Sequence, residues 1–136
     1  MFLHQAARVT RVILTSSAFL ALGSCSDDEP LTPNAPAACT GNVTVTVSAG
    51  TTPTFSWTPA CSIVSLYVEE GANDHWAIFA NGDPGFGPSV TYGMKPEGTN
   101  QTVPTTPLKA GSTYSVTLFR GPLASPQVSA LVIFTP

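Results

Sequence analysis

The 136-residue chain has little charge and few of the groups on which most enzymes and nucleic-acid-binding proteins depend. Only 10% of its residues are charged and its formal net charge is −3, so it lacks the clustered lysines and arginines that neutralise phosphates. Of its two histidines, only His75 lies beyond the N-terminal segment. We therefore predict no nucleic-acid partner and no histidine-activated nucleophile.

Catalytic motifs are also missing from the sequence. The glycine-rich run at 82–88 (GDPGFGP) lacks the Gly-Lys-Ser/Thr ending of a phosphate-binding loop, and no G-x-S-x-G motif occurs. Glu69 and Glu70 are adjacent, so on a strand they point to opposite faces and do not flank one glycosidic bond. The sequence predicts a protein that is not an enzyme and that uses no cofactor or metal.

One acidic stretch leaves a question about calcium open. Glu69, Glu70 and Asp74, together with Asn73, offer oxygen ligands of the kind that calcium takes, in an order that matches no EF-hand. Solvated charges at the end of a strand are the alternative. Both interpretations remain open at this point.

The chain has no apolar run of the about 20 residues that cross a bilayer as a helix. Arg8 and Arg11 precede a shorter apolar run at 12–23 (VILTSSAFLALG), which is typical of a signal peptide. The sequence at 22–25 (LGSC) then resembles the lipobox of bacterial lipoproteins. The resemblance implies that residues 1–24 are removed and that Cys25 is acylated, so the acyl chains attach the protein to a membrane. An ordinary secretory signal with an unrelated cysteine is the alternative.

Residues 25–38 are predicted to be a lipidated cysteine followed by an extended tether. Residues 26–38 (SDDEPLTPNAPAA) combine acids and prolines, which favour disordered, polyproline-like chain. The segment 26–29 (SDDE), with three consecutive acids, resembles the acidic export tag of surface lipoproteins in the Bacteroidetes. The expected location is the bacterial cell envelope, as an outer-membrane lipoprotein that faces either the outside or the periplasm.

The other two cysteines, Cys39 and Cys61, are predicted to form a disulfide, which exported proteins retain in oxidising compartments. Strict alternation predicts strands at 43–48 (VTVTVS) and 54–58 (TFSWT), joined by turn residues at 49–53 (AGTTP). Because the cysteines lie at nearly equal distances from this turn, they should face each other at the open end of the hairpin. Free or metal-bound thiols are the alternative.

The rest of the sequence also predicts short strands. Alternating apolar and polar residues, separated by clusters of Gly, Pro, Asn and Asp, predict strands at 64–69, 75–80, 89–92, 100–103, 114–119 and 128–135. No sustained helical period follows the signal segment. We therefore predict an all-β domain over residues 39–136, folded as a single antiparallel β-sandwich or a small barrel.

Two motifs resemble those of fibronectin type III domains. The segment 53–59 (PTFSWTP) resembles that family's second strand, with Trp57 as the core tryptophan, and 108–114 (LKAGSTY) resembles its tyrosine corner, with Tyr114 as the corner residue. The resemblance spans residues 43–134 and departs from the family at Leu66, where a tyrosine is common, and at the expected disulfide. It implies a fibronectin type III-like sandwich that serves as a binding or spacer module, with no particular ligand.

Three aromatic residues are the candidate ligand platform. Trp76, Phe79 and Phe86 lie near one another in the sequence and would stack against a sugar or a protein if they were exposed. The alternative is that Trp76 is in the core and Phe86 caps it.

The expected function is a lipid-anchored, non-catalytic recognition or adhesion module for an unidentified protein or glycan. The alternatives are a periplasm-facing accessory subunit of an outer-membrane complex, which would show an apolar patch or an open edge strand, and a carbohydrate-binding module, which would show an exposed aromatic pair.

Overall fold

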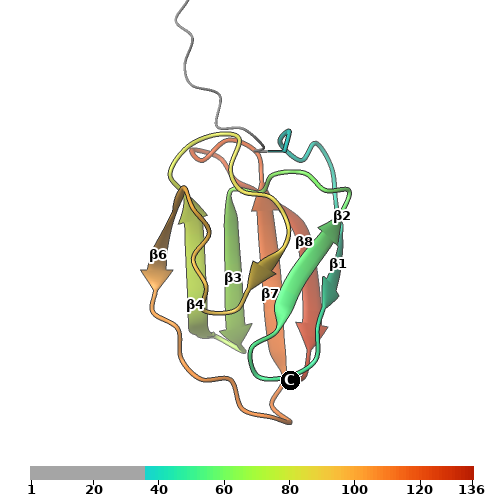
Figure 1. The fold of residues 1–136 in the computed structure, drawn as a ribbon, viewed down its shortest axis with the longest axis vertical. Helices are drawn as coiled ribbons and strands as arrows, with labels where there is room; N and C mark the ends of the chain where they lie inside the picture. The colour runs from blue at the N-terminus through green and yellow to red at the C-terminus, as the bar shows by residue number, and fades with distance from the viewer. Residues whose placement is uncertain (1–35) are drawn as a thin grey trace, which may run out of the picture. The chain divides into compact units, whose positions relative to one another are not determined.

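The computed structural model describes residues 36–136, which form two antiparallel β-sheets (Figure 1). The first sheet has the strand order β1-β2-β5 and the second has the order β6-β4-β3-β7-β8. The strands are β1 (Thr44–Val47), β2 (Thr54–Thr58), β3 (Ser65–Glu70), β4 (Asn73–Ala80), β5 (Val90–Thr91), β6 (Thr99–Val103), β7 (Tyr114–Arg120) and β8 (Gln127–Phe134). The prediction of an all-β sandwich is confirmed. The signal peptide, Cys25 and the acidic segment lie outside the described residues.

The strand predictions agree closely with the structure, with one instructive difference at the β3–β4 turn. The sequence predicts strands at 64–69 and 75–80, yet Asn73 already pairs with Glu70, which leaves only Gly71 and Ala72 between the strands. Gly71 has a φ of 62°, in the left-handed region that a two-residue hairpin turn requires and that glycine adopts without strain. Within residues 36–136 no helix is long and apolar enough to span a membrane.

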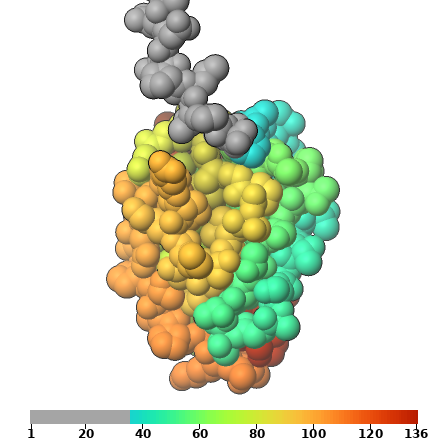
Figure 2. All heavy atoms as spheres, in the orientation of Figure 1, coloured from blue at the N-terminus to red at the C-terminus, as the bar shows by residue number. Residues whose placement is uncertain are grey.

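The core lies between the two sheets, and alternate side chains of the strands point into it. Because successive side chains of a strand point to opposite faces, alternation places Leu66 and Val68 of β3 and Val116 and Leu118 of β7 on the inner face. Further buried core residues are Phe55, Trp57, Trp76, Ile78, Val90 and Tyr114. The connection from β4 to β6 carries β5 and runs in front of β3 and β4 (Figures 1 and 2), where its Phe86 and Tyr92 join the core.

The segment that precedes β1 is tied to both sheets. The predicted disulfide between Cys39 and Cys61 is confirmed, although the β1–β2 ladder ends at the pair Thr44–Thr58 and does not continue to the cysteines. Part of the segment assigned to the tether instead hydrogen-bonds to Ser62, whose N–H donates to the Ala37 carbonyl at 2.8 Å and whose hydroxyl donates to the Pro36 carbonyl at 2.6 Å. These bonds fasten the entry of the chain to the end of the sandwich that lies opposite the C-terminus (Figure 1).

Candidate functional site

The outer face of the five-stranded sheet is unusually apolar, and nothing in the described part of the chain covers it. We call this surface, formed by Tyr67, Phe79, Phe119, Val128, Leu131 and Ile133, the apolar face. Its residues come from β3, β4, β7 and β8, four neighbouring strands of the sheet. They are the side chains that alternate with the core residues of the same strands.

The centre of the apolar face is a cluster of three aromatic rings. Tyr67 packs edge-to-face against Phe79 at 5.2 Å and against Phe119 at 5.4 Å between ring centroids. Ser65 pairs with both phenylalanines in the strand register and is buried between them. Each of the three rings is partly buried, so the cluster still presents aromatic surface to the outside.

The β8 side of the apolar face exposes three aliphatic side chains. Val128, Leu131 and Ile133 are 51%, 60% and 67% exposed. Val128 is opposite Phe119 in the register and Leu131 is opposite Thr117, whose other neighbour is Tyr67. The aliphatic and aromatic side chains are therefore contiguous. Scattered exposed apolar residues need no explanation, but a contiguous patch of this kind marks an interaction surface.

One end of the apolar face carries negative charge. Ile133 is opposite Ser115, which is opposite Glu69, and Glu69 pairs with Asp74 on β4. Burial, and then the charges of Asp74 and Glu69, raise the pKa of the Tyr67 phenol above its usual value. The phenol is therefore neutral at physiological pH and keeps a hydroxyl that can donate a hydrogen bond at the acidic end of the patch.

The predicted platform of Trp76, Phe79 and Phe86 does not form. Trp76 is fully buried in the core, at 0% exposure, and Phe86 is 5% exposed, whereas Phe79 lies on the opposite side of the same sheet. Positions 76 and 79 differ by an odd number, so strand alternation separates them. The structure matches the alternative, in which Trp76 belongs to the core.

Two backbone hydrogen bonds to Ile63 hold Phe86 in its buried position. Its N–H donates to the Ile63 carbonyl at 3.0 Å and its carbonyl accepts from the Ile63 N–H at 2.9 Å. The adjacent Gly85 passes so close that a Cβ there would lie 2.0 Å from the Ile63 oxygen. A glycine is therefore needed for this loop to bring Phe86 into the core.

The acidic and histidine side chains near the β3–β4 turn have a structural role. His75 Nε2 lies 3.3 Å from the Glu70 carboxylate, and its Nδ1 lies 2.7 Å from the Thr106 hydroxyl. The Tyr92 hydroxyl donates to the Thr106 carbonyl at 2.6 Å, so this network fastens the connection between β6 and β7. The residues that the structure describes contain no group of three or more His, Cys, Asp or Glu that is placed to hold a metal.

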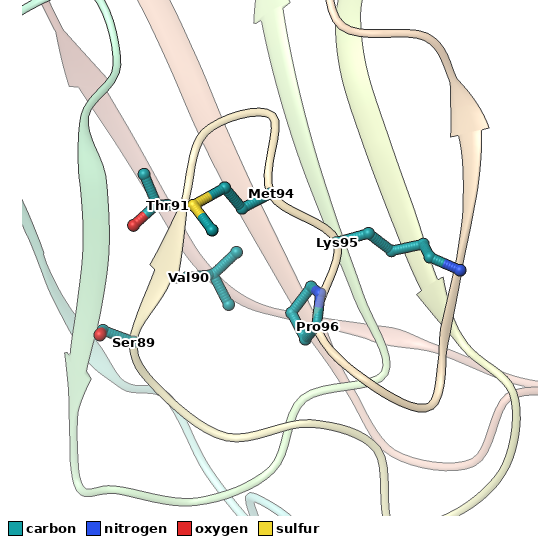
Figure 3. A pocket seen from close by; sticks show the side chains of 6 residues that line it. All are labelled: Ser89, Val90, Thr91, Met94, Lys95 and Pro96. Atoms are coloured by element: carbon teal, nitrogen blue, oxygen red, sulfur yellow. The ribbon is translucent and has the colours of Figure 1, made fainter.

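A shallow pocket of about 210 Å³ lies beside β5, in the other sheet (Figure 3). The side chains of Val90 and Pro96 face each other across it, and Lys95 points away toward β6. Its only charged lining group thus turns out of the cavity. The pocket lacks the convergent polar groups that fix a small ligand, so the apolar face is the stronger candidate.

Comparison with known proteins adds no relative: no family model matches the chain, and neither the curated proteins nor the solved structures contain a match.

Proposed function

We propose that the protein is a lipid-anchored protein of the bacterial cell envelope whose β-sandwich is a non-catalytic recognition module. The single observation that carries this function is the contiguous apolar face on the outer side of the five-stranded sheet. Burying exposed aliphatic and aromatic side chains against a partner is favourable, at roughly 25 cal/mol per Å² of apolar area. The face is thus a surface for binding and not for chemistry.

A fibronectin type III-like assignment has structural support at both of its motifs. The Tyr114 hydroxyl accepts a hydrogen bond from the Lys109 N–H at 3.0 Å, a contact from the start of a strand back to upstream backbone of the kind that defines a tyrosine corner. Trp57 is buried between the sheets, and its indole N–H donates to the Cys61 carbonyl at 2.8 Å. We propose a sandwich of this general type, with β6 as an additional strand outside β4.

The proposed location is supported by the leader and by the disulfide. The lipobox-like residues at 22–25 favour acylation of Cys25, and the Cys39–Cys61 disulfide fits an oxidising compartment such as the periplasm or the cell surface. A tether ahead of residue 36 would then join the membrane to the disulfide-bonded end of the sandwich.

A protein fits the apolar face better than a glycan does. Sugar rings stack on open aromatic faces, but here Tyr67 packs edge to face against both Phe79 and Phe119. The neighbouring β8 side chains are aliphatic, and Glu69 and Asp74 lie at one end. The matching partner is a protein surface with apolar residues at its centre and a basic residue opposite the acidic pair.

Site-specific photo-crosslinking in cells tests this function. A benzoylphenylalanine replaces Phe79 in the full chain, and the matched control carries it at Thr46, an exposed position on β1 of the other sheet. We expect a discrete protein adduct from position 79 and none from position 46. An adduct from position 46 alone, or loss of the position-79 adduct on digestion of glycans, would contradict a protein partner on this face.

A further inference from the structure

Half of the edge strand β8 makes no backbone hydrogen bond on its outer side, although β1 of the other sheet lies close to β8. β8 pairs with β7 along its length, and on its other side Val43 donates its N–H to the Ser129 carbonyl at 3.1 Å. The Ser129 hydroxyl also donates to the Gly41 carbonyl at 2.9 Å. Beyond Ser129, no other segment within residues 36–136 hydrogen-bonds to the outer backbone edge of residues 130–134. This free half of β8 presents unpaired backbone groups.

The free half of β8 lacks the features that keep edge strands apart. Proteins protect such edges with charged side chains, proline or a bulge. Residues 130–134 (ALVIF) contain no charged residue and no proline. The bulge of the β7–β8 ladder lies between Leu118 and Phe119, at Ser129, and the register is regular from Ala130 to Phe134. The backbone groups of this edge are therefore in regular strand geometry and remain without hydrogen-bond partners.

We propose that the free half of β8 pairs antiparallel with the same segment of a second copy of the chain. Antiparallel pairing of identical strands is self-complementary about a two-fold axis. Side chains of one face then meet side chains of the same face. Leu131 and Ile133 of one copy contact Ile133 and Leu131 of the other, on the outer side of the joined sheet. The two five-stranded sheets become one, and their apolar faces become continuous.

Charge favours this segment over the remaining surface as the place where two copies meet. The described residues carry more acids than bases: Glu69, Glu70, Asp74, Asp83 and Glu97 against Lys95, Lys109 and Arg120. Two copies repel each other on average, and like charges that face each other across strands are destabilising. The free half of β8 is uncharged, so pairing there brings no like charges directly opposite each other.

The test measures the mass of the protein, purified in detergent from cell envelopes, by sedimentation, for the wild type, for Ile133→Lys and for the matched control Gln101→Lys. Both positions are exposed and lie on the two opposite edge strands of the five-stranded sheet, β8 and β6. We expect two chains per particle for the wild type and for Gln101→Lys, and at least a tenfold weaker association for Ile133→Lys. A mixture of Ile133→Lys and Ile133→Asp chains should restore the pair, which a misfolded variant would not do.

A monomeric wild type, or a dimer that Ile133→Lys leaves intact, would overturn the proposal. A monomer whose β8 crosslinks to an extended segment of a different protein would also overturn it. Failure here is separable from failure of the proposed function, because that function is tested at Phe79 on β4, three strands away from β8.

Discussion

The two faces of the five-stranded sheet are made by the same strands and meet different surroundings. On the inner face, Trp76 and Ile78 are sealed by the three-stranded sheet and by the connection that carries β5. On the outer face, Phe79 and Tyr67 cover each other only in part, and Ile133 is largely exposed. Both faces are rich in apolar side chains, yet only one is buried within residues 36–136. The contrast supports the proposal that the outer face makes a contact outside this domain.

The largest expected difference between the faces is in stability. Trp76→Ala should lower the free energy of unfolding by about 3–5 kcal/mol, because it removes a fully buried ring and leaves a cavity. Phe79→Ala on the outer face should cost about 1 kcal/mol, the scale of an edge-to-face aromatic pair. Urea unfolding of both variants measures the difference. Equal losses would mean that the outer face is as tightly packed as the core.

Removing the disulfide should also lower the free energy of unfolding, but through the unfolded state and not through core packing. The bond joins residues 22 apart, and replacing both Cys39 and Cys61 by Ala should cost about 3 kcal/mol in the chain-entropy model. The reason is that the unfolded chain regains the freedom of a closed loop. Urea unfolding, with Phe79→Ala as the reference for an outer-face change, provides the measurement. A double variant as stable as the wild type would show that the backbone bonds around Ser62 suffice.

A smaller change at the core edge tests the tyrosine corner. Tyr114→Phe keeps the buried ring and leaves the Lys109 N–H without the hydroxyl that accepts from it. The expected loss is about 1–2 kcal/mol, the cost of an unmade hydrogen bond. A calorimetric melting temperature that does not change would argue against a structural role for this hydroxyl.

The smallest effect concerns a titration on the outer face. Asp74→Asn should lower the pKa of Tyr67 toward 10.0, because it removes one of the two charges that oppose the phenolate. Since the folded-state pKa is raised, its stabilising contribution is present below the unfolded pKa and is lost as the pH rises through the folded one. Ultraviolet titration of the tyrosines reports the shift. A Tyr67 pKa that does not move would leave burial and the charge of Glu69 as its causes.

The strands and the disulfide were predictable because they depend on local pattern. Alternation identifies the strands, and the position of the 49–53 turn brings Cys39 and Cys61 together even though the ladder ends before them. The hydrogen bonds from Ser62 to Pro36 and Ala37 were not predictable, because a segment rich in acids and prolines indicates only an extended tether.

The apolar face was not predicted from the sequence, for a reason of topology. Tyr67, Phe79 and Phe119 each occupy the face opposite the core residues of their own strand, which alternation alone indicates. Their contact requires the order β4-β3-β7, in which β7 is far from β3 in sequence. The expected platform relied instead on sequence proximity, which does not distinguish Trp76 on one side of the sheet from Phe79 on the other.

Oxidative footprinting in two settings tests the central claim that the apolar face is a contact surface. The full chain is labelled with hydroxyl radicals in isolated cell envelopes and again after purification in detergent. We predict that Tyr67, Phe79 and Phe119 are labelled less in envelopes, while Met94, which is 66% exposed beside β5, is labelled equally in both. Equal labelling of the three aromatic residues in both settings would contradict the account.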